Sequence, residues 1–498
     1  MTINLIACVT NYKNKLAIGK NEDLLFKLSD DMKFFKNITT NSLSCTSLLD
    51  KNIVLMGRKT YFSIPNQNRP LSNRINFVLT KDIELLKLSP VPKDLILKKD
   101  LYFLSLETFT KIYLKYKPNV FVIGGSTIYN IFLNKVKIHK LYITHVQTSD
   151  NKDIKFDLGE EPDKFMFNFS SDFKLIGFTE KQICGKLSYR VLFYNKATFL
   201  TDEYKYLHLM KNILKNGNER PDRTETGTIS QFGTQIRFDI SQSIPLVTTK
   251  KVPFKSMIYE LLWILQGNTN SKILQKQGVN IWNDNTSREF LDKQNLHHYD
   301  EGVLGAGYGF QLRHFGASYS QRFSDTREID STLIGGVDQL KHVEFLLKTD
   351  PFSRRILFSY WNPVDFDKTA LVPCHFSVQF YVEEINKEKF LSCHFTMRSN
   401  DLMCGFPWNI SSYSALTYIL AKKCDMKPKD IIYTCGDCHI YNTHIKEVEE
   451  QLQRTPRPFP KLIVDDLVKY KDWKNITIDD FELVGYFPHP SIKVAMAI

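Results

Sequence analysis

The C-terminal half of this 498-residue chain contains a cysteine whose setting suits a reactive thiol. Cys374 lies in "LVPCHFSVQFYV" (371–382), where every second residue is apolar, which is the period of a strand with one buried face. The apolar positions are Phe376, Val378, Phe380 and Val382. At the start of such a strand, a cysteine is either a small core residue or a thiolate presented to a substrate.

Arginines in separate segments favour the second interpretation. Arg223 lies in the turn-like "PDRTETGT", Arg354 and Arg355 precede a predicted strand, and Arg398 opens "RSNDLMCGFPWN". Guanidinium groups suit a phosphate, and neighbouring positive charge makes a thiol more nucleophilic. Because consecutive strand residues point to opposite faces, Arg354 and Arg355 need not serve one site within one subunit. Further polar candidates are Ser399, Asp401, Asn409, His439 and Tyr441.

The region 203–498 resembles thymidylate synthase, with these segments in that family's order and "PHPSIKVAMAI" at the end. The resemblance implies that Cys374 adds to C6 of the uracil ring of dUMP, so that C5 attacks the methylene group of 5,10-methylenetetrahydrofolate. Hydride transfer from the folate then yields dTMP and dihydrofolate. The implied dUMP-binding residues are Arg223, Arg398, His375, Ser399, Asn400, Asp401, Asn409, His439 and Tyr441, with Arg354 and Arg355 of the partner subunit. The Asn409 amide offers one donor and one acceptor to the uracil edge, which helps to discriminate against cytosine.

A carboxylate inside an apolar helix also needs an explanation. Glu260 lies in "FKSMIYELLWILQG" (254–267), where a lone glutamate is costly unless it has a function or a buried water network. The resemblance implies that Glu260 handles the proton from C5 and that Tyr308 lies near that step. It places folate contacts at Trp282, Asp401, Gly405 and Ala497. Glu225, in "DRTETGT" where that family usually has a glycine, is a candidate for weakened anion binding.

Two other motifs are less informative. "CGDC" (435–438) is a C-x-x-C, but it lacks a second cysteine pair and lies inside the nucleotide-binding "GDCHIY", where Cys438 occupies a small-residue position. His297 and His298 stand alone in a polar segment, which favours a surface pair over a metal site. We therefore expect no metal.

In the N-terminal half, one carboxylate and a glycine pair are the candidates. Asp31 lies on the inner side of a predicted helix (29–38), although an acid there also suits the positive end of a helix dipole. Gly124 and Gly125 follow a predicted strand and precede a predicted helix (126–135), which brings backbone N–H groups to a diphosphate. The sequence is not a G-x-G-x-x-G, so a Rossmann dehydrogenase is poorly supported.

Residues 3 to about 195 resemble dihydrofolate reductase. The resemblance implies that Asp31 binds the pterin and promotes protonation at N5 while NADPH delivers hydride to C6. It implies dihydrofolate contacts at Ala7, Asp31, Phe35, Ile64, Arg74 and Thr144, with Thr144 supporting the acid and Arg74 pairing with the substrate's α-carboxylate. The implied cofactor-binding residues are Ala17, Gly19, Arg58, Lys59, Thr60, Thr80, Lys81, Gly124, Gly125 and Ser126, with Arg58 and Lys81 as candidates for the 2′-phosphate.

Two features of this half remain open. That family usually has Leu-Pro-Trp where "LLF" (24–26) stands, so Leu25 removes a stiff proline and Phe26 removes an indole donor that orders a water. An idle reductase half is therefore an alternative. The resemblance also implies a cis bond between Gly124 and Gly125.

Alternation of strand-like and helix-like segments predicts an α/β N-terminal domain (1–195), followed by a junction (196–202) and a long mixed segment (203–498), for which the resemblance implies an α+β domain. The resemblances imply a mixed central sheet flanked by helices in the first and a large sheet at a dimer interface in the second. We therefore expect one chain with two activities, in which the reductase recycles the dihydrofolate that the synthase produces.

Composition is consistent with this expectation. The net charge of +12 favours anionic partners, and the lysines are spread along the chain, so a nucleic-acid-binding protein is the less favoured alternative. No apolar run is long enough for a transmembrane helix, and the first residues read as a buried strand rather than a signal peptide. With nine scattered cysteines, we expect a cytoplasmic, reducing location.

Overall fold

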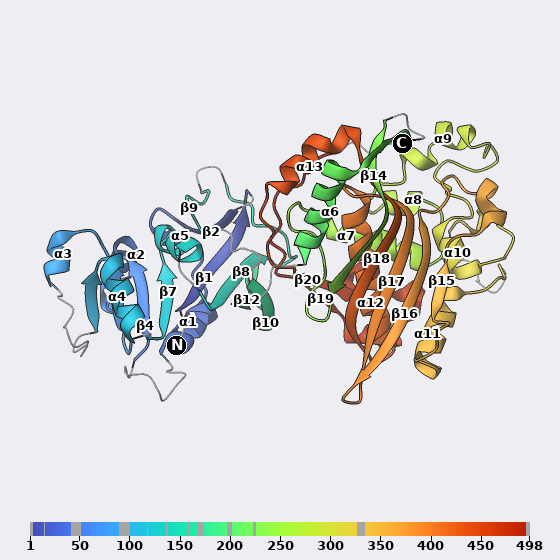
Figure 1. The fold of residues 1–498 in the computed structure, drawn as a ribbon. Coiled ribbons are helices and arrows are strands. Elements are labelled where there is room, and N and C mark those ends of the chain that lie inside the picture. Colours follow the sequence, from blue (N-terminus) through green and yellow to red (C-terminus); the bar gives the residue numbers. More distant parts are fainter. Residues whose placement is uncertain are drawn as a thin grey trace. The chain divides into compact units, whose positions relative to one another are not determined.

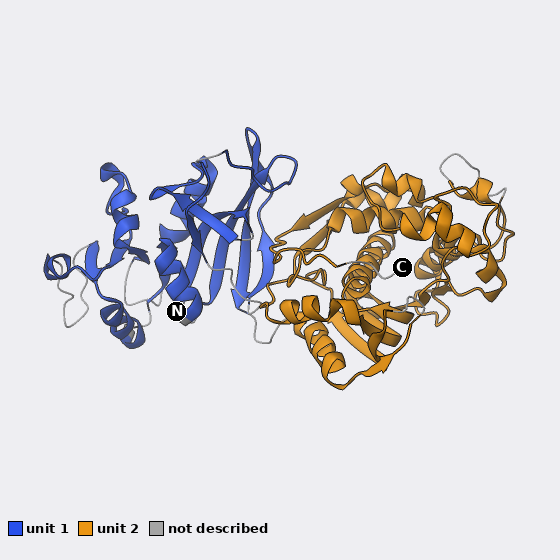
Figure 2. Cartoon of the chain, turned by 90° about the horizontal axis from the view of Figure 1, so that it is seen from above, with its two compact units in different colours: residues 1–200 blue, residues 201–498 orange. Residues whose placement is uncertain are grey.

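The computed structural model describes residues 3–13, 15–40, 51–88, 100–116, 118–135, 138–157, 160–166, 173–196, 202–222, 226–325 and 334–494. Arg223, Glu225 and Ala497 lie outside these ranges. The chain divides into two compact units, Met1–Leu200 and Thr201–Ile498 (Figure 2). Each unit has its own sheet and hydrophobic core.

The first unit is built on a mixed sheet in the order β10-β12-β8-β1-β7-β4-β5-β6, with β2, β3, β9 and β11 attached beside this path (Figure 1). The strands from β8 to β6 are parallel, and β12 and β10 continue antiparallel. The strands are β1 (Ile3–Tyr12), β2 (Lys15–Lys20), β3 (Asp23–Leu24), β4 (Ile53–Gly57), β5 (Ile75–Leu79), β6 (Leu101–Leu104), β7 (Val120–Gly124), β8 (Lys140–Thr148), β9 (Lys164–Met166), β10 (Phe173–Phe178), β11 (Gln182–Cys184) and β12 (Leu187–Lys196).

Helices connect the parallel strands, as a parallel sheet requires. They are α1 (Ser29–Thr40), α2 (Arg58–Ser63), α3 (Ile83–Leu88), α4 (Leu106–Tyr116) and α5 (Ser126–Lys135), with the 3₁₀ turn η1 (Asn66–Asn68). The strands β4 and β5 are almost wholly buried, which is the near-continuous apolar pattern of strands covered on both faces. The predicted helices at 29–38 and 126–135 are confirmed as α1 and α5.

The second unit contains a six-stranded sheet in the order β13-β14-β18-β17-β16-β15, which is antiparallel except between β17 and β18. A separate hairpin-like pair is formed by β19 and β20. The strands are β13 (Asn218–Arg220), β14 (Thr228–Asp239), β15 (Leu357–Ser359), β16 (His375–Ile385), β17 (Glu388–Asp401), β18 (Lys427–Tyr441), β19 (Lys461–Val464) and β20 (Phe481–Val484).

Helices cover one face of this sheet. The long helix α12 packs on β17 and β18, and α6 packs on β14 and β18. The helices are α6 (Glu203–Asn216), α7 (Phe254–Leu265), α8 (Lys272–Gln275), α9 (Arg288–Lys293), α10 (Tyr308–His314), α11 (Gln339–Thr349), α12 (Gly405–Lys423) and α13 (Ile445–Leu452). Short 3₁₀ turns are η2 (Asp284–Thr286), η3 (Gln321–Phe323), η5 (Pro363–Lys368), η6 (Asn442–His444), η7 (Asp466–Tyr470), η8 (Trp473–Asn475) and η9 (Ile478–Asp480).

The strand that follows Cys374 has the predicted alternation over most of its length. In β16, Val378, Phe380 and Val382 are buried. Phe376 is 42% exposed, contrary to the predicted pattern, because the pairing of β16 with β17 shifts register between His375 and Ser377. Such an irregularity turns a side chain to the other face and re-aims the residues next to it.

No helix among the described residues is long and apolar enough to cross a bilayer.

Candidate active sites

Cys374 is half-buried immediately before β16 and is held from two sides. Its backbone N–H donates to the hydroxyl of Tyr308 at 3.0 Å, and its carbonyl accepts from the backbone N–H of Arg398 at 2.9 Å. Tyr308 opens α10, and Arg398 lies on β17. Three segments far apart in the sequence therefore fix the backbone at the thiol.

The Arg398 guanidinium lies beside the turn that carries the thiol. Its Nε donates to the Pro373 carbonyl at 2.9 Å and its Nη2 to the Val372 carbonyl at 3.0 Å. The residue is nevertheless exposed, so part of its donor fork faces outward. Since a guanidinium carries five N–H donors, an anion can still be bound in two-point fashion next to Cys374.

Among the described residues, the predicted Arg354 and Arg355 are not brought to this thiol, and Arg223 lies outside the described ranges. Arg354 and Arg355 are exposed in the turn before β15, and in the described ranges no hydrogen bond or ion pair joins their guanidinium groups to residues around Cys374. Gln379 of β16 donates to the Arg354 carbonyl at 3.4 Å, which places this turn along the strand from Cys374.

Glu260 lies on α7 and is held by two indole groups. Trp282 Nε1 donates to its Oε1 at 2.8 Å, and Trp408 Nε1 donates to its Oε2 at 2.5 Å. Burial raises the pKa of the carboxyl group, and the Trp408 and Trp282 donors oppose that rise. The carboxylate that the sequence showed as costly is thus satisfied by side chains.

An aromatic wall links this carboxylate to the thiol. The Trp282 and Tyr308 rings lie 5.7 Å apart, and the Tyr308 and His375 rings lie 5.0 Å apart. Tyr308 is 4% exposed, and burial raises the pKa of its hydroxyl well above the ordinary value. The phenol therefore stays protonated at neutral pH and can donate to a developing anion or to a water.

The two asparagines form a short chain of amides. Asn409 Nδ2 donates to Asn400 Oδ1 at 3.3 Å, and Asn400 Nδ2 donates to the Tyr433 hydroxyl at 3.2 Å. Gly405 allows this arrangement, since a Cβ there would lie 2.2 Å from Asn400 Oδ1. The order of donors sets the orientation of the Asn409 amide.

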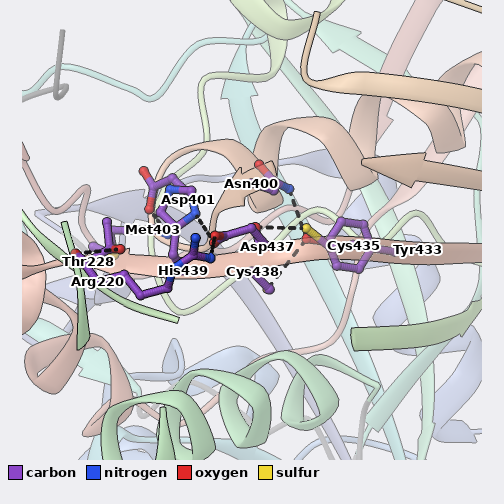
Figure 3. A network of polar contacts seen from close by, with 10 residues as sticks. All are labelled: Arg220, Thr228, Asn400, Asp401, Met403, Tyr433, Cys435, Asp437, Cys438 and His439. Atoms are coloured by element: carbon purple, nitrogen blue, oxygen red, sulfur yellow. Dashed lines mark hydrogen bonds and ion pairs between the residues drawn. The ribbon is translucent and has the colours of Figure 1, made fainter. Parts of the chain in front are cut away.

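His439 and Tyr441 lie two residues apart on β18, with their rings 5.0 Å apart (the histidine is labelled in Figure 3). Asp437 accepts from His439 Nδ1 at 3.1 Å and pairs with Arg220 at 2.7 Å. Burial acts to lower the pKa of His439, but the neighbouring Asp437 and Asp401 outweigh it, so the pKa is raised. The ring is positioned as a donor for a hydroxyl group. Ser399 lies half-buried on the adjacent strand β17.

Asp401 ends β17 and turns back on the start of α12. Its Oδ1 accepts from the Met403 N–H at 2.8 Å and its Oδ2 from the Cys404 N–H at 3.0 Å. Burial acts to raise the pKa of this carboxyl group, but His444 and the Met403 N–H outweigh it, so the pKa is lowered. Of the predicted folate contacts, the structure describes Trp282, Asp401 and Gly405.

The C-x-x-C motif and the His297–His298 pair have surroundings that suit structural roles. Cys435 and Cys438 are fully buried free thiols, and Cys438 Sγ lies 3.7 Å from the Tyr433 hydroxyl (Figure 3). His297 pairs with Asp292 at 2.9 Å, with a side chain 68% exposed. Trp408 and His444, by contrast, were not singled out from the sequence, because a tryptophan in "FPWN" and a histidine in "NTH" carry no local sign of their distant partners.

In the first unit, Asp31 is only 6% exposed and lies on the inner side of α1 as predicted. Thr144 Oγ1, on β8, donates to Asp31 Oδ1 at 2.5 Å. Burial raises the pKa of this carboxyl group, and the Thr144 hydroxyl opposes the rise. The helix-dipole explanation alone does not account for such a buried, partnered acid, whereas a site for a polar ring edge does.

Arg74 is 4% exposed and close to the end of α1. Its Nη1 donates to Thr39 Oγ1 at 2.8 Å, its Nε donates to the Ser72 carbonyl at 3.0 Å, and its guanidinium lies 5.6 Å from the Phe35 ring centre. Burial lowers the pKa of the guanidinium. A buried cation with spare donors is well suited to a carboxylate. Ala7 is buried on β1, and Ile64 and Phe35 pack beside one apolar cluster.

Near the glycine pair, Thr60 is in close contact with both residues. A Cβ on Gly125 (φ +55°) would lie 2.9 Å from Thr60 Oγ1, and one on Gly124 would lie 2.9 Å from Thr60 Cγ2. Ser126 then begins α5. The implied cis bond here is wrong, because Arg69–Pro70 is the only cis peptide bond in the described parts of the chain.

The charged cofactor candidates already have partners. Arg58 pairs with Asp82 at 2.8 Å and Lys59 with Glu22 at 2.6 Å, and both pairs are solvent-exposed. Exposed pairs of this kind contribute little stability and can reorganise around a phosphate. Thr80 is half-buried beside the exposed Lys81, and Ala17 and Gly19 lie on β2.

A half-buried thiol beside an arginine in one unit, and a buried acid together with a strand–glycine–helix turn in the other, are consistent with a two-domain enzyme of nucleotide and redox chemistry. Comparison with known proteins gives the families. The thymidylate synthase family model matches residues 204–498, and the dihydrofolate reductase family model matches residues 2–174.

Relatives contain both domains in one chain. The bifunctional dihydrofolate reductase-thymidylate synthase of Zea mays is 39% identical over 512 residues, covering 97% of this chain and 95% of its own. Bifunctional dihydrofolate reductase-thymidylate synthase 2 of Arabidopsis thaliana is 39% identical over 510 residues (97% and 87%), and the Paramecium tetraurelia protein is 37% identical over 487 residues (97% and 96%). The chain belongs to the bifunctional dihydrofolate reductase–thymidylate synthase family.

The chain therefore joins two reactions of thymidylate synthesis. Its C-terminal domain converts dUMP to dTMP with 5,10-methylenetetrahydrofolate, and its N-terminal domain reduces the resulting dihydrofolate with NADPH. Neither reaction assigns a metal to the chain. The recognition of both families from sequence motifs is confirmed, as is the α/β and α+β fold class.

Proposed function

We propose that Cys374, Tyr308 and Glu260 form the catalytic centre of the synthase domain. The observation that carries this proposal is the hydrogen bond between the Cys374 N–H and the Tyr308 hydroxyl, at 3.0 Å. Through the ring contact of Tyr308 with Trp282, the nucleophile and the proton-handling Glu260 share one wall. Cys374 forms the bond to C6, and the wall keeps a proton donor and acceptor next to C5.

The nucleotide is bound by groups around this wall. Arg398 faces the phosphate, and Arg223 is assigned the same role. Asn409 reads the uracil edge with an amide whose orientation is set by Asn400, while His439 and Tyr441 meet the ribose hydroxyl. The remaining contacts are His375, Ser399 and Asp401. Folate is assigned to Trp282, Asp401, Gly405 and Ala497.

The synthase domain works as a homodimer. The sheet face opposite α12 is unusually apolar for a free surface: Phe232 is 84% exposed, Tyr381 64% and Leu357 44%. Apolar residues of this size in the open favour an interface. Arg354 and Arg355 are exposed in the turn before β15, next to this face, and each completes the phosphate site of the other subunit.

In the reductase domain, Asp31 binds the pterin edge and promotes protonation at N5, and Thr144 sets its orientation and charge state. Arg74 binds the α-carboxylate, and Ala7, Phe35 and Ile64 pack against the ring system. Phe26 packs against the cluster of Leu28, Val146 and Tyr189, so the "LLF" segment is anchored without a tryptophan. This supports an active reductase half.

The residues fit NADPH. The N-terminus of α5 beside Gly124, Gly125 and Ser126 offers backbone donors to a diphosphate, and Thr60 supports this turn. Arg58, Lys59 and Lys81 supply positive charge for the 2′-phosphate, while Thr80, Ala17 and Gly19 line the approach. NADPH supplies the hydride when bound, and the protein orients the two rings and provides the proton.

We assign residues 1–195 to the reductase domain, 196–202 to a junction and 203–498 to the synthase domain. The division of contacts near residue 200 and the family matches support these limits. The described cysteines are all free thiols, which supports a cytoplasmic location.

Subunit complementation tests the shared site. Arg355→Ala and Cys374→Ala proteins should each lack synthase activity, and mixing them should restore about a quarter of the wild-type rate after random exchange. The matched control mixes Arg398→Ala with Cys374→Ala, which should restore nothing because both residues serve the same subunit's site. No rescue in verified Arg355→Ala/Cys374→Ala hybrids would contradict the shared site.

A further inference from the structure

Three potential metal ligands meet at the start of α12, two from the β17–α12 connection and one from η6. Asp401 ends β17, Cys404 immediately precedes α12, and His444 ends η6. One ligand atom from each, a carboxylate oxygen, Sγ and an imidazole nitrogen, lie within 4.8 Å of one another. His444 Nδ1 is 3.9 Å from Asp401 Oδ1.

We propose that Asp401, Cys404 and His444 form an inhibitory Zn²⁺ site of the synthase domain. One sulfur, one nitrogen and one oxygen donor match the ligands that zinc prefers, and the thiolate disfavours Mg²⁺ and Ca²⁺. Three protein ligands leave a fourth position for water. On binding, the Cys404 thiol loses its proton to solvent and the sulfur lone pair forms the bond to zinc, so no redox partner is needed.

Two of the ligands are already held in place. The Asp401 oxygens accept from the Met403 and Cys404 N–H groups, and each oxygen retains a further lone pair. His444 is 1% exposed, and its ring lies edge-on to Tyr441 at 5.5 Å. Small side-chain rotations are therefore enough to bring the donors from a 4.8 Å cluster to coordination distance.

The positive charge nearest to the cluster does not outweigh the negative charge of its ligands. The ammonium of buried Lys250 donates to the Met403 carbonyl, next to Cys404. The carboxylate and the zinc-bound thiolate carry two negative charges against this one positive charge. The Asp401–Cys404–His444 cluster therefore favours a divalent cation over the proton of the Cys404 thiol.

The proposed zinc site overlaps the proposed folate site more than the proposed dUMP site. Under the proposed function Asp401 contacts both substrates, but Gly405, next to Cys404, is assigned to folate alone, so bound zinc should compete more strongly with 5,10-methylenetetrahydrofolate than with dUMP. This competition rests on that assignment, whereas metal binding rests only on the three ligands. Two separate readouts distinguish the two claims.

The binding test uses cobalt(II) as a spectroscopic probe on the full chain carrying Cys374→Ala, which removes the thiol of the active site. We expect about one equivalent of cobalt per chain with a thiolate-to-metal charge-transfer band, which zinc then displaces. Adding Cys404→Ser should abolish the band. The matched control Cys424→Ser, at the other end of α12, should retain it, and circular dichroism of each variant reports folding. Absence of the band, or its persistence in Cys404→Ser, would overturn the site.

The activity test uses chains with native Cys374. Zinc should inhibit dTMP formation, and added methylenetetrahydrofolate should relieve this inhibition more strongly than added dUMP. The half-inhibitory zinc concentration should rise at least about tenfold in Cys404→Ser and stay unchanged in Cys424→Ser. Equal sensitivity of the two variants would contradict the inhibitory role. A Cys404-dependent band with inhibition that folate does not relieve would instead contradict the folate assignment of Asp401.

Discussion

The Trp408 indole N–H donates to Oε2 of Glu260 at 2.5 Å, while Trp282 holds Oε1 at 2.8 Å. Each oxygen of the carboxylate thus has its own aromatic donor. This arrangement fixes the rotamer of Glu260 and stabilises its ionised form against the cost of burial. Trp408 acts through Glu260 and is a positioning residue.

Trp408→Phe should raise the pKa of Glu260, because the indole donor that opposes the effect of burial is lost. The limb of the synthase pH–rate profile that reports ionisation of Glu260 should move to higher pH, with kcat/KM at neutral pH about tenfold lower. Release of tritium from [5-³H]dUMP measures the proton step. The matched control is Trp473→Phe, which removes an indole donor from Glu344, outside the proposed site. Identical profiles for Trp408→Phe and wild type would refute the role.

Thr144→Val should change the reductase in a related way. The Thr144 hydroxyl lowers the pKa of Asp31, so its loss raises that pKa further above the ordinary value. Under the proposed role of Asp31 in protonation, the descending limb of the reductase pH profile should move to higher pH, with kcat falling about tenfold from lost orientation. Steady-state NADPH oxidation across pH measures this, with Thr148→Val on the same strand as control. An unshifted descending limb would show that the Thr144 hydroxyl does not set the pKa of Asp31.

Phe232→Asp should disrupt the proposed homodimer, because a charge would be buried in the apolar interface. Light scattering should show monomers at micromolar concentration, with synthase activity down at least about tenfold and reductase activity retained. Phe345→Asp is the control, since Phe345 is also exposed, at 60%, but lies on α11 away from the sheet face. A Phe232→Asp protein that remained dimeric and active would show that Phe232 is not part of the subunit interface.

The sequence predicts the elements better than their distant partners. The predicted helix at 29–38 is α1, and the apolar helix with Glu260 is α7, because both patterns depend on neighbours along the chain. Phe376 was wrongly assigned to the buried face, since the register shift after His375 depends on pairing with β17.

Contacts between side chains far apart in the sequence could be identified only from the fold. The cost of Glu260 was visible in its apolar surroundings, but Trp282 and Trp408 are 22 and 148 residues away. Arg58 was expected to be available for a phosphate, and its pairing with Asp82 depends on β4 lying next to β5. The Asp401–Cys404–His444 cluster likewise joins the β17–α12 connection to a 3₁₀ turn about 40 residues further along the chain.

The central claim is that one chain carries two chemically independent centres, one at Cys374 and one at Asp31. The most direct measurement assays dTMP formation and NADPH-dependent dihydrofolate reduction on the same preparations of Cys374→Ser and Asp31→Asn. Cys374→Ser should lose dTMP formation by at least about a thousandfold and keep reduction within about twofold, and Asp31→Asn should show the reverse pattern. Substantial dTMP formation by folded Cys374→Ser, or reduction unaffected by Asp31→Asn, would contradict the account.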